Sequence, residues 1–154
     1  MPEPRKTVAV DLDGVLADFS RGFVDINTIG DPIPGAVEFT RRLSQFADVL
    51  IWTTRCNPEI GRGMGTSLLR NIVRDWLDRH GFAYADIWTG PVKPIAAAFI
   101  DDRAVSCRPG TDQAVNRGTF NVAEMYARAL CKDTPPGCSM SHTTPVLEKG
   151  ASDA

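Results

Sequence analysis

The sequence predicts an α/β fold with a parallel sheet. Short apolar, β-rich runs lie at residues 7–10, 49–52 and 97–100, and segments with helical periodicity separate them. A chain of 154 residues has room for one domain with a single core. Because strands that alternate with helices usually form parallel sheets with both faces covered, we expect helices on both faces of this one.

The strands are expected from their composition and flanks. The first run, residues 7–10, leads from charged residues straight into Asp11. The second, residues 49–52, ends in the polar triplet TTR, and the last, residues 97–100, ends in Asp101 and Asp102. A further short strand is expected at residues 85–88. Short, continuous apolar runs of this kind are typical of buried central strands.

Four helices are expected between and after these strands, at residues 20–29, 35–46, 67–80 and 121–130. The third has the clearest pattern, with one apolar face and Gly81 placed to cap its end. That face is formed by Leu68, Leu69, Ile72, Val73, Trp76 and Leu77. Glycine and proline mark loops at residues 30–35 and 56–66. We expect a domain over residues 1–132 and a disordered tail over residues 133–154, where large apolar residues are few.

The overall charge and composition limit the function classes. The 17 basic and 19 acidic residues give a net charge of −2, which gives no strong sign of polymeric nucleic-acid binding. No apolar run approaches the roughly 20 residues of a membrane helix, and the N-terminus has no secretory pattern. The four cysteines show no metal-finger spacing. We therefore expect a cytoplasmic protein with no membrane partner and leave its oligomeric state open.

Acidic side chains follow two of the expected strands at the point where each strand ends. Asp11 and Asp13 follow the first strand, and Asp101 and Asp102 follow the last. Ligands of parallel α/β sheets bind beyond the carboxyl ends of the strands, so these four carboxylates are expected to converge. Their mutual repulsion calls for a cation, and ligation by oxygen alone favours Mg²⁺.

The same edge of the sheet carries groups that suit a phosphoryl anion. Thr53 ends the second strand and offers a hydroxyl donor, and Lys93 in the loop before the last strand offers a positive charge. One carboxylate can then attack phosphorus, and a second can protonate the leaving oxygen and later activate water. The second carboxylate needs a pKa above its usual value of about 3.9 to hold that proton near neutral pH.

Four segments resemble the motifs of the haloacid dehalogenase superfamily, in that family's order. They are DLDGV at 11–15, VLIWTT at 49–54, Lys93 in VKP, and AFIDD at 98–102. The resemblance implies a Rossmann-like fold in which Asp11 is the nucleophile and forms an aspartyl-phosphate. It implies that Asp13 is the general acid and base, and that Thr53 and Lys93 bind the phosphoryl group.

The resemblance also implies the magnesium ligands. These are Asp11, the backbone carbonyl of Asp13, and Asp102, with Asp101 assisting directly or through water. An aspartate at position 13 is similar to the phosphatase and phosphomutase branches of the family. The intervals from Asp13 to Thr53 and from there to Lys93 are filled by scaffold elements, so no sizeable cap domain is expected.

Several residues remain open between a functional and a purely structural role. Thr54 is the second candidate for the phosphoryl contact, and Arg55 and Arg62 are candidates for substrate binding, although loop arginines are often simply solvated. The paired aspartates alone also occur as turn formers after strands. We favour the functional interpretation because all four motifs occur together.

The combined prediction is a capless, Mg²⁺-dependent phosphohydrolase that acts on phosphomonoesters, with a small phosphorylated substrate such as a nucleotide. Two alternatives stay open. One is an end-processing phosphatase for nucleic acids, which a basic rim around Arg55, Arg62 and Arg70 would favour. The other is a phosphoryl-binding regulatory module without turnover, against which the presence of both Asp11 and Asp13 argues.

Overall fold

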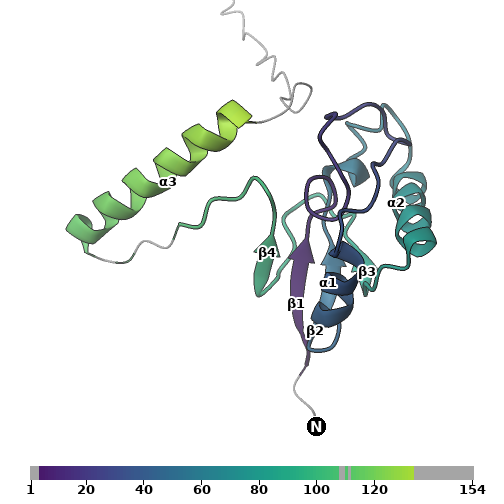
Figure 1. Cartoon of the computed structure of the whole chain (residues 1–154), viewed down its shortest axis with the longest axis horizontal. Helices are drawn as coiled ribbons and strands as arrows, with labels where there is room; N and C mark the ends of the chain where they lie inside the picture. Colours follow the sequence, from purple (N-terminus) through teal and green to yellow (C-terminus); the bar gives the residue numbers. More distant parts are fainter. Residues whose placement is uncertain (1–3, 108–109, 111, 134–154) are drawn as a thin grey trace, which may run out of the picture.

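The computed structural model describes residues 4–107, 110 and 112–133. Its centre is a parallel sheet of four strands in the order β3-β2-β1-β4. The strands are β1 (Lys6–Val10), β2 (Ala47–Ile51), β3 (Asp86–Ile87) and β4 (Ala98–Ile100). The helices are α1 (Ala36–Leu43), the short 3₁₀ helix η1 (Thr54–Cys56), α2 (Thr66–His80) and α3 (Gln113–Asp133). The predicted α/β fold with a parallel sheet is confirmed (Figure 1).

The register of the sheet brings the strand ends together. Val10 pairs with Ile51 on one side and with Ile100 on the other, so β1, β2 and β4 end level with one another. Two backbone hydrogen bonds extend this alignment by one residue: Asp11 N donates to Ile100 O, and Trp52 N donates to Val10 O, both at 2.9 Å. The residues that follow these strands therefore start from one edge of the sheet.

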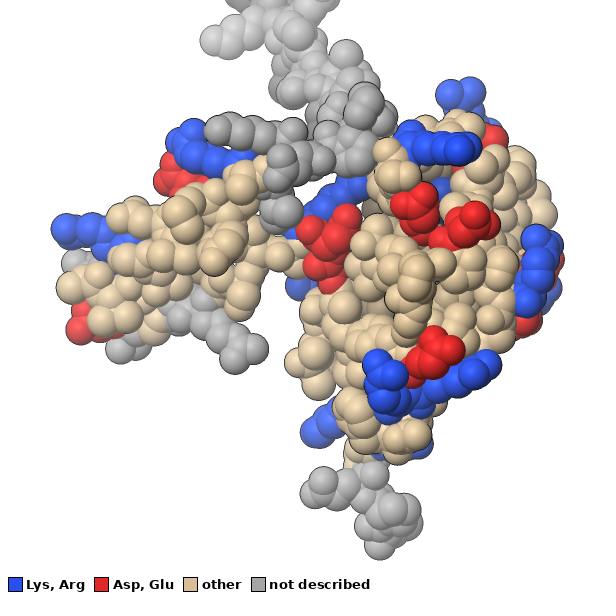
Figure 2. Space-filling model, viewed as in Figure 1, with Lys and Arg blue, Asp and Glu red and all other residues tan. Residues whose placement is uncertain are grey.

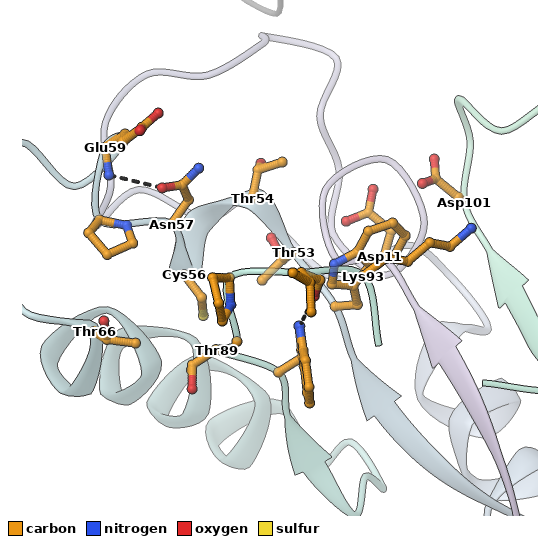
Figure 3. Close-up of a pocket in the computed structure, with 16 residues that line it drawn as sticks. Asp11, Thr53, Thr54, Cys56, Asn57, Glu59, Thr66, Thr89, Lys93 and Asp101 are labelled. Carbon is orange, nitrogen blue, oxygen red and sulfur yellow. Dashed lines mark hydrogen bonds between the residues drawn. The ribbon is translucent and has the colours of Figure 1, made fainter. Parts of the chain in front are cut away.

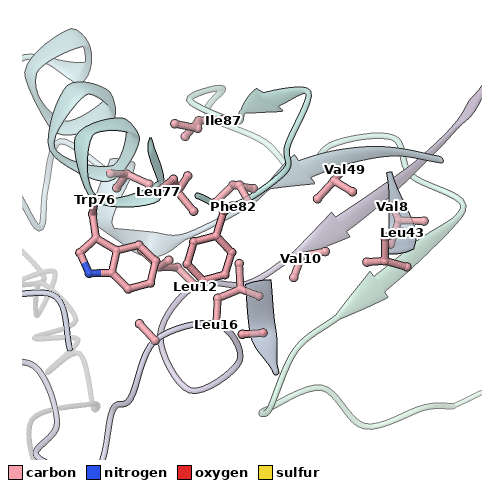
Figure 4. Close-up of a cluster of buried hydrophobic side chains, with 14 of the residues drawn as sticks. Val8, Val10, Leu12, Leu16, Leu43, Val49, Trp76, Leu77, Phe82 and Ile87 are labelled. Atoms are coloured by element: carbon pink, nitrogen blue, oxygen red, sulfur yellow. The ribbon is translucent and has the colours of Figure 1, made fainter. Parts of the chain in front are cut away.

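The main core lies between one face of the sheet and two helices (Figure 4). Strand residues that alternate in β1 and β2 form the sheet side, and α1 and α2 supply the other side. The buried members include Val8, Val10, Val49, Ile51, Leu43, Val73, Trp76 and Leu77. The indole of Trp76 stacks on Phe82, with ring centroids 5.1 Å apart, and this contact fixes the chain just after α2.

Both α1 and α2 pack on this same face, which differs from the expected cover on two faces. The reason is topological. The β1-α1-β2 and β2-α2-β3 crossovers advance in the same direction across the sheet, and right-handed crossovers then place both helices on one side. Residues 88–97, which lead to β4 on the other side of β1, contain no helix. In Figure 1, α3 stands apart from the sheet.

The helix expected at residues 20–29 is absent, and this prediction was wrong. Asp18 and Asp25 fold the segment into side-chain turns instead. Asp25 Oδ1 accepts from the backbone N–H groups of Asn27 and Thr28, both at 2.8 Å, and Asp18 Oδ1 accepts from Ser20 N at 3.1 Å. Gly22 has a φ of 69°, a conformation that a helix does not contain.

The other elements agree with the expectations within a few residues at their ends, except that α3 begins eight residues earlier than the helix expected at 121–130. The expected tail, apart from Asp133 at the end of α3, lies outside the described residues. Among the described helices, none combines the length and the apolar character that a bilayer crossing needs.

Candidate active site

Three carboxylates gather where β1 and β4 end. Asp11, Asp101 and Asp102 each bring an oxygen into a group whose members all lie within 4.8 Å of one another. The turn after β1 closes tightly against this group, since a Cβ atom at Gly14 would overlap the Asp102 carboxylate. Gly14 also has a φ of 86°, so glycine suits this position on both counts.

The electrostatics of the cluster favour a bound cation. Burial raises the pKa of Asp11 to about 7, and the charges of Asp101, Asp13 and Asp102 add to that rise, while the Leu12 N–H opposes it. Burial also raises the pKa of Asp102, and the charge of Asp101 contributes in the same direction. Carboxylate oxygens in a group of this size suit Mg²⁺, so Asp11, Asp101 and Asp102 are the residues that would hold it.

Asp13 does not join this group but pairs with a buried arginine. Arg55 Nε donates to Asp13 Oδ2 at 2.7 Å, and Arg55 Nη2 donates to Asp13 Oδ1 at 3.0 Å. Both carboxylate oxygens of Asp13 are therefore engaged in a two-pronged ion pair. The backbone of Asp13 still lies in the turn that starts from Asp11, two residues from the acidic cluster.

The remaining donors of Arg55 bind the loop after β1. Its Nη1 donates to the carbonyls of Asp25 and Ile26 at 3.0 and 3.2 Å, and its Nη2 donates to the carbonyl of Thr28 at 2.9 Å. The guanidinium also lies over the ring of Phe23, 5.2 Å from its centroid. Arg55 is only 2% exposed, so it connects Asp13 to this loop inside the protein.

The sequence left Arg55 open between substrate binding and a solvated loop position, whereas the structure buries it against Asp13 and outside the pocket lining. Its two partners, Asp13 and the loop carbonyls, lie about thirty to forty positions away along the chain. The one local signal is its position directly after the strand-end threonines. Arg62, the other predicted substrate contact, is exposed with a φ of 49° and does not line the pocket described below.

The two threonines of the second motif differ in their surroundings. Thr53 is buried, and its Oγ1 accepts from Arg55 N at 3.2 Å, which caps η1. Thr54 is exposed. Both line the pocket, so the choice between them as the phosphoryl contact stays a prediction.

Lys93 reaches the site from the loop between β3 and β4. Its Nζ lies 4.1 Å from the centroid of the Phe99 ring, and that ring makes an edge contact with Trp52. Lys93 and Asp11 both line the pocket drawn in Figure 3. The aromatic ring holds the ammonium group at the rim of the site, where it can turn toward an anion.

A pocket of about 760 Å³ opens beside the acidic cluster (Figure 3). Asp11, Asp101 and Lys93 line one end, and Asn57 and Glu59 line the other. The remaining lining residues are Trp52, Thr53, Thr54, Cys56, Pro58, Thr66, Trp88, Thr89, Gly90, Pro91 and Val92. The structure thus brings Asp11, Asp101, Thr53, Thr54 and Lys93 to one cavity, while Asp13 and Arg55 lie outside its lining.

Comparisons with known proteins find similar solved structures but no sequence family. No family model matches the chain, and no curated protein matches it. A structure described as target APC26283 from Vibrio cholerae is 27% identical, with a TM-score of 0.42, and the match covers 76% of this chain and 98% of that one. A D,D-heptose 1.7-bisphosphate phosphatase from B. bronchiseptica, solved with magnesium and phosphate, is 23% identical, with a TM-score of 0.39. The match covers 79% of this chain and 63% of the phosphatase.

The chain's own features agree with the resemblance found in its sequence. The sheet is parallel, its strand order is β3-β2-β1-β4, and aspartates follow the two strands that the resemblance requires. These features are the α/β arrangement expected of a haloacid dehalogenase-like fold.

Proposed function

We propose that this protein is a Mg²⁺-dependent phosphohydrolase of the haloacid dehalogenase type, acting on phosphomonoesters. The observation that carries the proposal is the convergence of Asp11, Asp101 and Asp102, two of which, Asp11 and Asp101, line a pocket together with Lys93. Three carboxylates provide a magnesium site, and the lysine provides a fixed positive charge for the phosphoryl oxygens.

In the proposed reaction, an Asp11 carboxylate oxygen attacks phosphorus and the bond to the leaving oxygen breaks. Asp13 enters this step protonated and gives its proton to the leaving oxygen, and Thr53 and Lys93 hold the phosphoryl oxygens. Asp13 then removes a proton from water, which attacks the aspartyl-phosphate and releases phosphate. When bound, Mg²⁺ would neutralise the carboxylates and the phosphoryl charge.

The role of Asp13 requires a movement. Both of its oxygens accept hydrogen bonds from Arg55, and Asp13 is not among the residues that line the pocket. For proton transfer, the Asp13 side chain must turn until at least one oxygen leaves Arg55 and reaches the leaving oxygen. In place of substrate binding, we assign to Arg55 the task of holding Asp13 and the loop at residues 25–28 beneath the site.

A small substrate is favoured over a nucleic-acid end. The basic rim that would favour nucleic acid requires three free arginines, but Arg55 is buried and Arg70 is paired with Asp86 at 2.6 Å. On the face shown in Figure 2, basic and acidic side chains alternate without an extended basic stripe. Within the class of small phosphomonoesters, we propose a nucleotide as the substrate.

The test is phosphate release from an aryl phosphate and from a panel of nucleotides, with Mg²⁺ and with EDTA. Wild type is compared with Asp11→Asn, and Asp75→Asn serves as the matched control because Asp75 is an exposed acid on α2. We expect release that needs Mg²⁺, is abolished in Asp11→Asn and is unchanged in Asp75→Asn. Absence of release from every substrate by folded, metal-binding protein would refute the proposal.

A further inference from the structure

The end of the pocket away from Asp11 has no cationic side chain among its lining residues. Lys93 is the single basic residue in the wall, and it lies at the same end as Asp11 and Asp101. At the opposite end stand the amide of Asn57 and the carboxylate of Glu59. A substrate that places its phosphoryl group at Asp11 therefore directs its leaving group toward a neutral and acidic wall.

The rest of this wall is polar but uncharged, with apolar patches. Three threonines, Thr54, Thr66 and Thr89, supply hydroxyl groups, and Trp52 and Trp88 supply flat apolar surface. The Trp88 indole is fixed because its Nε1 donates to Val92 O at 2.7 Å. Hydroxyl and amide groups that both donate and accept suit an alcohol with several hydroxyl groups.

The backbone of Glu59, whose side chain is exposed at this end of the pocket, is held in place by the local chain. Asn57 Oδ1 accepts a hydrogen bond from Glu59 N at 3.0 Å, a turn that fixes the backbone of Glu59 relative to the pocket. The first turn of α2 begins at Thr66 in the pocket wall and carries a partial positive charge of about half a unit. The full negative charge of Glu59 is larger, and Glu59 is the single charged side chain that lines this end of the pocket, so its carboxylate would repel a second anion bound there.

We propose that the substrate is a monophosphate of an uncharged, hydroxyl-bearing alcohol, and that Glu59 selects against substrates with a second phosphate. This inference rests on the proposed phosphohydrolase function and narrows its substrate class. Sugar monophosphates and nucleoside monophosphates both belong to the class.

The experiment compares kcat/KM for matched pairs that differ by one phosphate. The pairs are fructose 6-phosphate with fructose 1,6-bisphosphate, and adenosine 5′-monophosphate with adenosine 3′,5′-bisphosphate. Each pair is measured with full-length wild type, Glu59→Gln and Glu59→Lys. Glu38→Lys is the control, because Glu38 is an exposed acid on α1 outside the pocket and carries the same change of charge.

We expect wild type to prefer the monophosphate at least tenfold in both pairs. Glu59→Gln should reduce this preference and Glu59→Lys should abolish or reverse it, while Glu38→Lys should keep it. A wild-type preference for the bisphosphate, or equal ratios in Glu59→Lys and Glu38→Lys, would overturn the inference. Phosphate release from para-nitrophenyl phosphate by wild type separates the phosphohydrolase function from the preference for monophosphates. Its absence would refute the phosphohydrolase function itself.

Discussion

Replacement of Arg55 by methionine is expected to destabilise the fold strongly. The change removes both hydrogen bonds to the Asp13 carboxylate and the three bonds to carbonyls of residues 25–28. Asp13 would then be a carboxylate that is 8% exposed and has lost its charged partner. Arg55→Met keeps a long apolar side chain, so loss of the charge and donors dominates the effect.

The magnitude follows from the burial of the pair. Breaking a buried ion pair by removing one partner costs about 3–5 kcal/mol. A domain is stable by about 5–15 kcal/mol, so this loss is a large share of the total. Arg55→Lys keeps the charge but cannot reach both Asp13 oxygens and the loop carbonyls with one nitrogen, so its cost should be intermediate.

The assay is urea unfolding followed by fluorescence, with Arg74→Met as the matched control. Arg74 forms a surface ion pair with Asp75 at 3.1 Å, and such pairs contribute about 0–1 kcal/mol. A double-mutant cycle with Asp13→Asn isolates the coupling between Asp13 and Arg55. A cost below about 1 kcal/mol for Arg55→Met would refute the reasoning that this pair holds the loop and the site together.

Three further predictions concern the acidic cluster and its lysine. The folded-state pKa of Asp11, about 7, lies above its ordinary value of 3.8, so its contribution to stability is full below pH 3.8 and is lost as the pH rises through 7. In urea unfolding without Mg²⁺, the free energy of unfolding of wild type should therefore fall by up to about 4 kcal/mol between pH 4 and pH 7.5, relative to that of Asp11→Asn. The same dependence of the free energy of unfolding on pH in both proteins would contradict this prediction. Mg²⁺ should raise the melting temperature of wild type at pH 7.5, and Asp102→Asn should need at least tenfold more Mg²⁺ for the same rise. An unchanged Mg²⁺ requirement in Asp102→Asn would show that Asp102 is not a metal ligand. Lys93→Met should lower kcat/KM for an aryl phosphate by about 10²–10³-fold, the range for loss of one group that stabilises developing charge. Its free energy of unfolding should stay within about 0.5 kcal/mol of wild type, because Lys93 is exposed. An unchanged kcat/KM would show that Lys93 does not stabilise the phosphoryl group.

The strands and the acidic cluster could be predicted because their signals are local. Each strand is a short apolar run, and the rule that ligands bind at the carboxyl ends of parallel strands is enough to bring Asp11, Asp101 and Asp102 together. The helix α2 was also predictable, since one face repeats apolar residues and Gly81 follows it with a φ of 75°.

The features that could not be predicted depend on long-range contacts. Nothing local in the segment 20–29 shows that three of its carbonyls are bound by Arg55, which is about thirty positions away. The same arginine draws the Asp13 side chain away from the pocket, a result that a strand-end motif does not reveal. We expected helices on both faces of the sheet. The order of strands and helices does not reveal that the connection to β4, residues 88–97, contains no helix.

The central claim is that the Asp11 carboxylate carries the phosphoryl group during turnover. The most direct measurement is acid quenching of the enzyme during turnover of a ³²P-labelled phosphomonoester, followed by borohydride reduction and peptide mass spectrometry. We expect label on the peptide that contains Asp11 and conversion of Asp11 to homoserine after reduction. Neither should occur in Asp11→Asn. Release of phosphate by wild type with no label at Asp11, or with label at another residue, would contradict it.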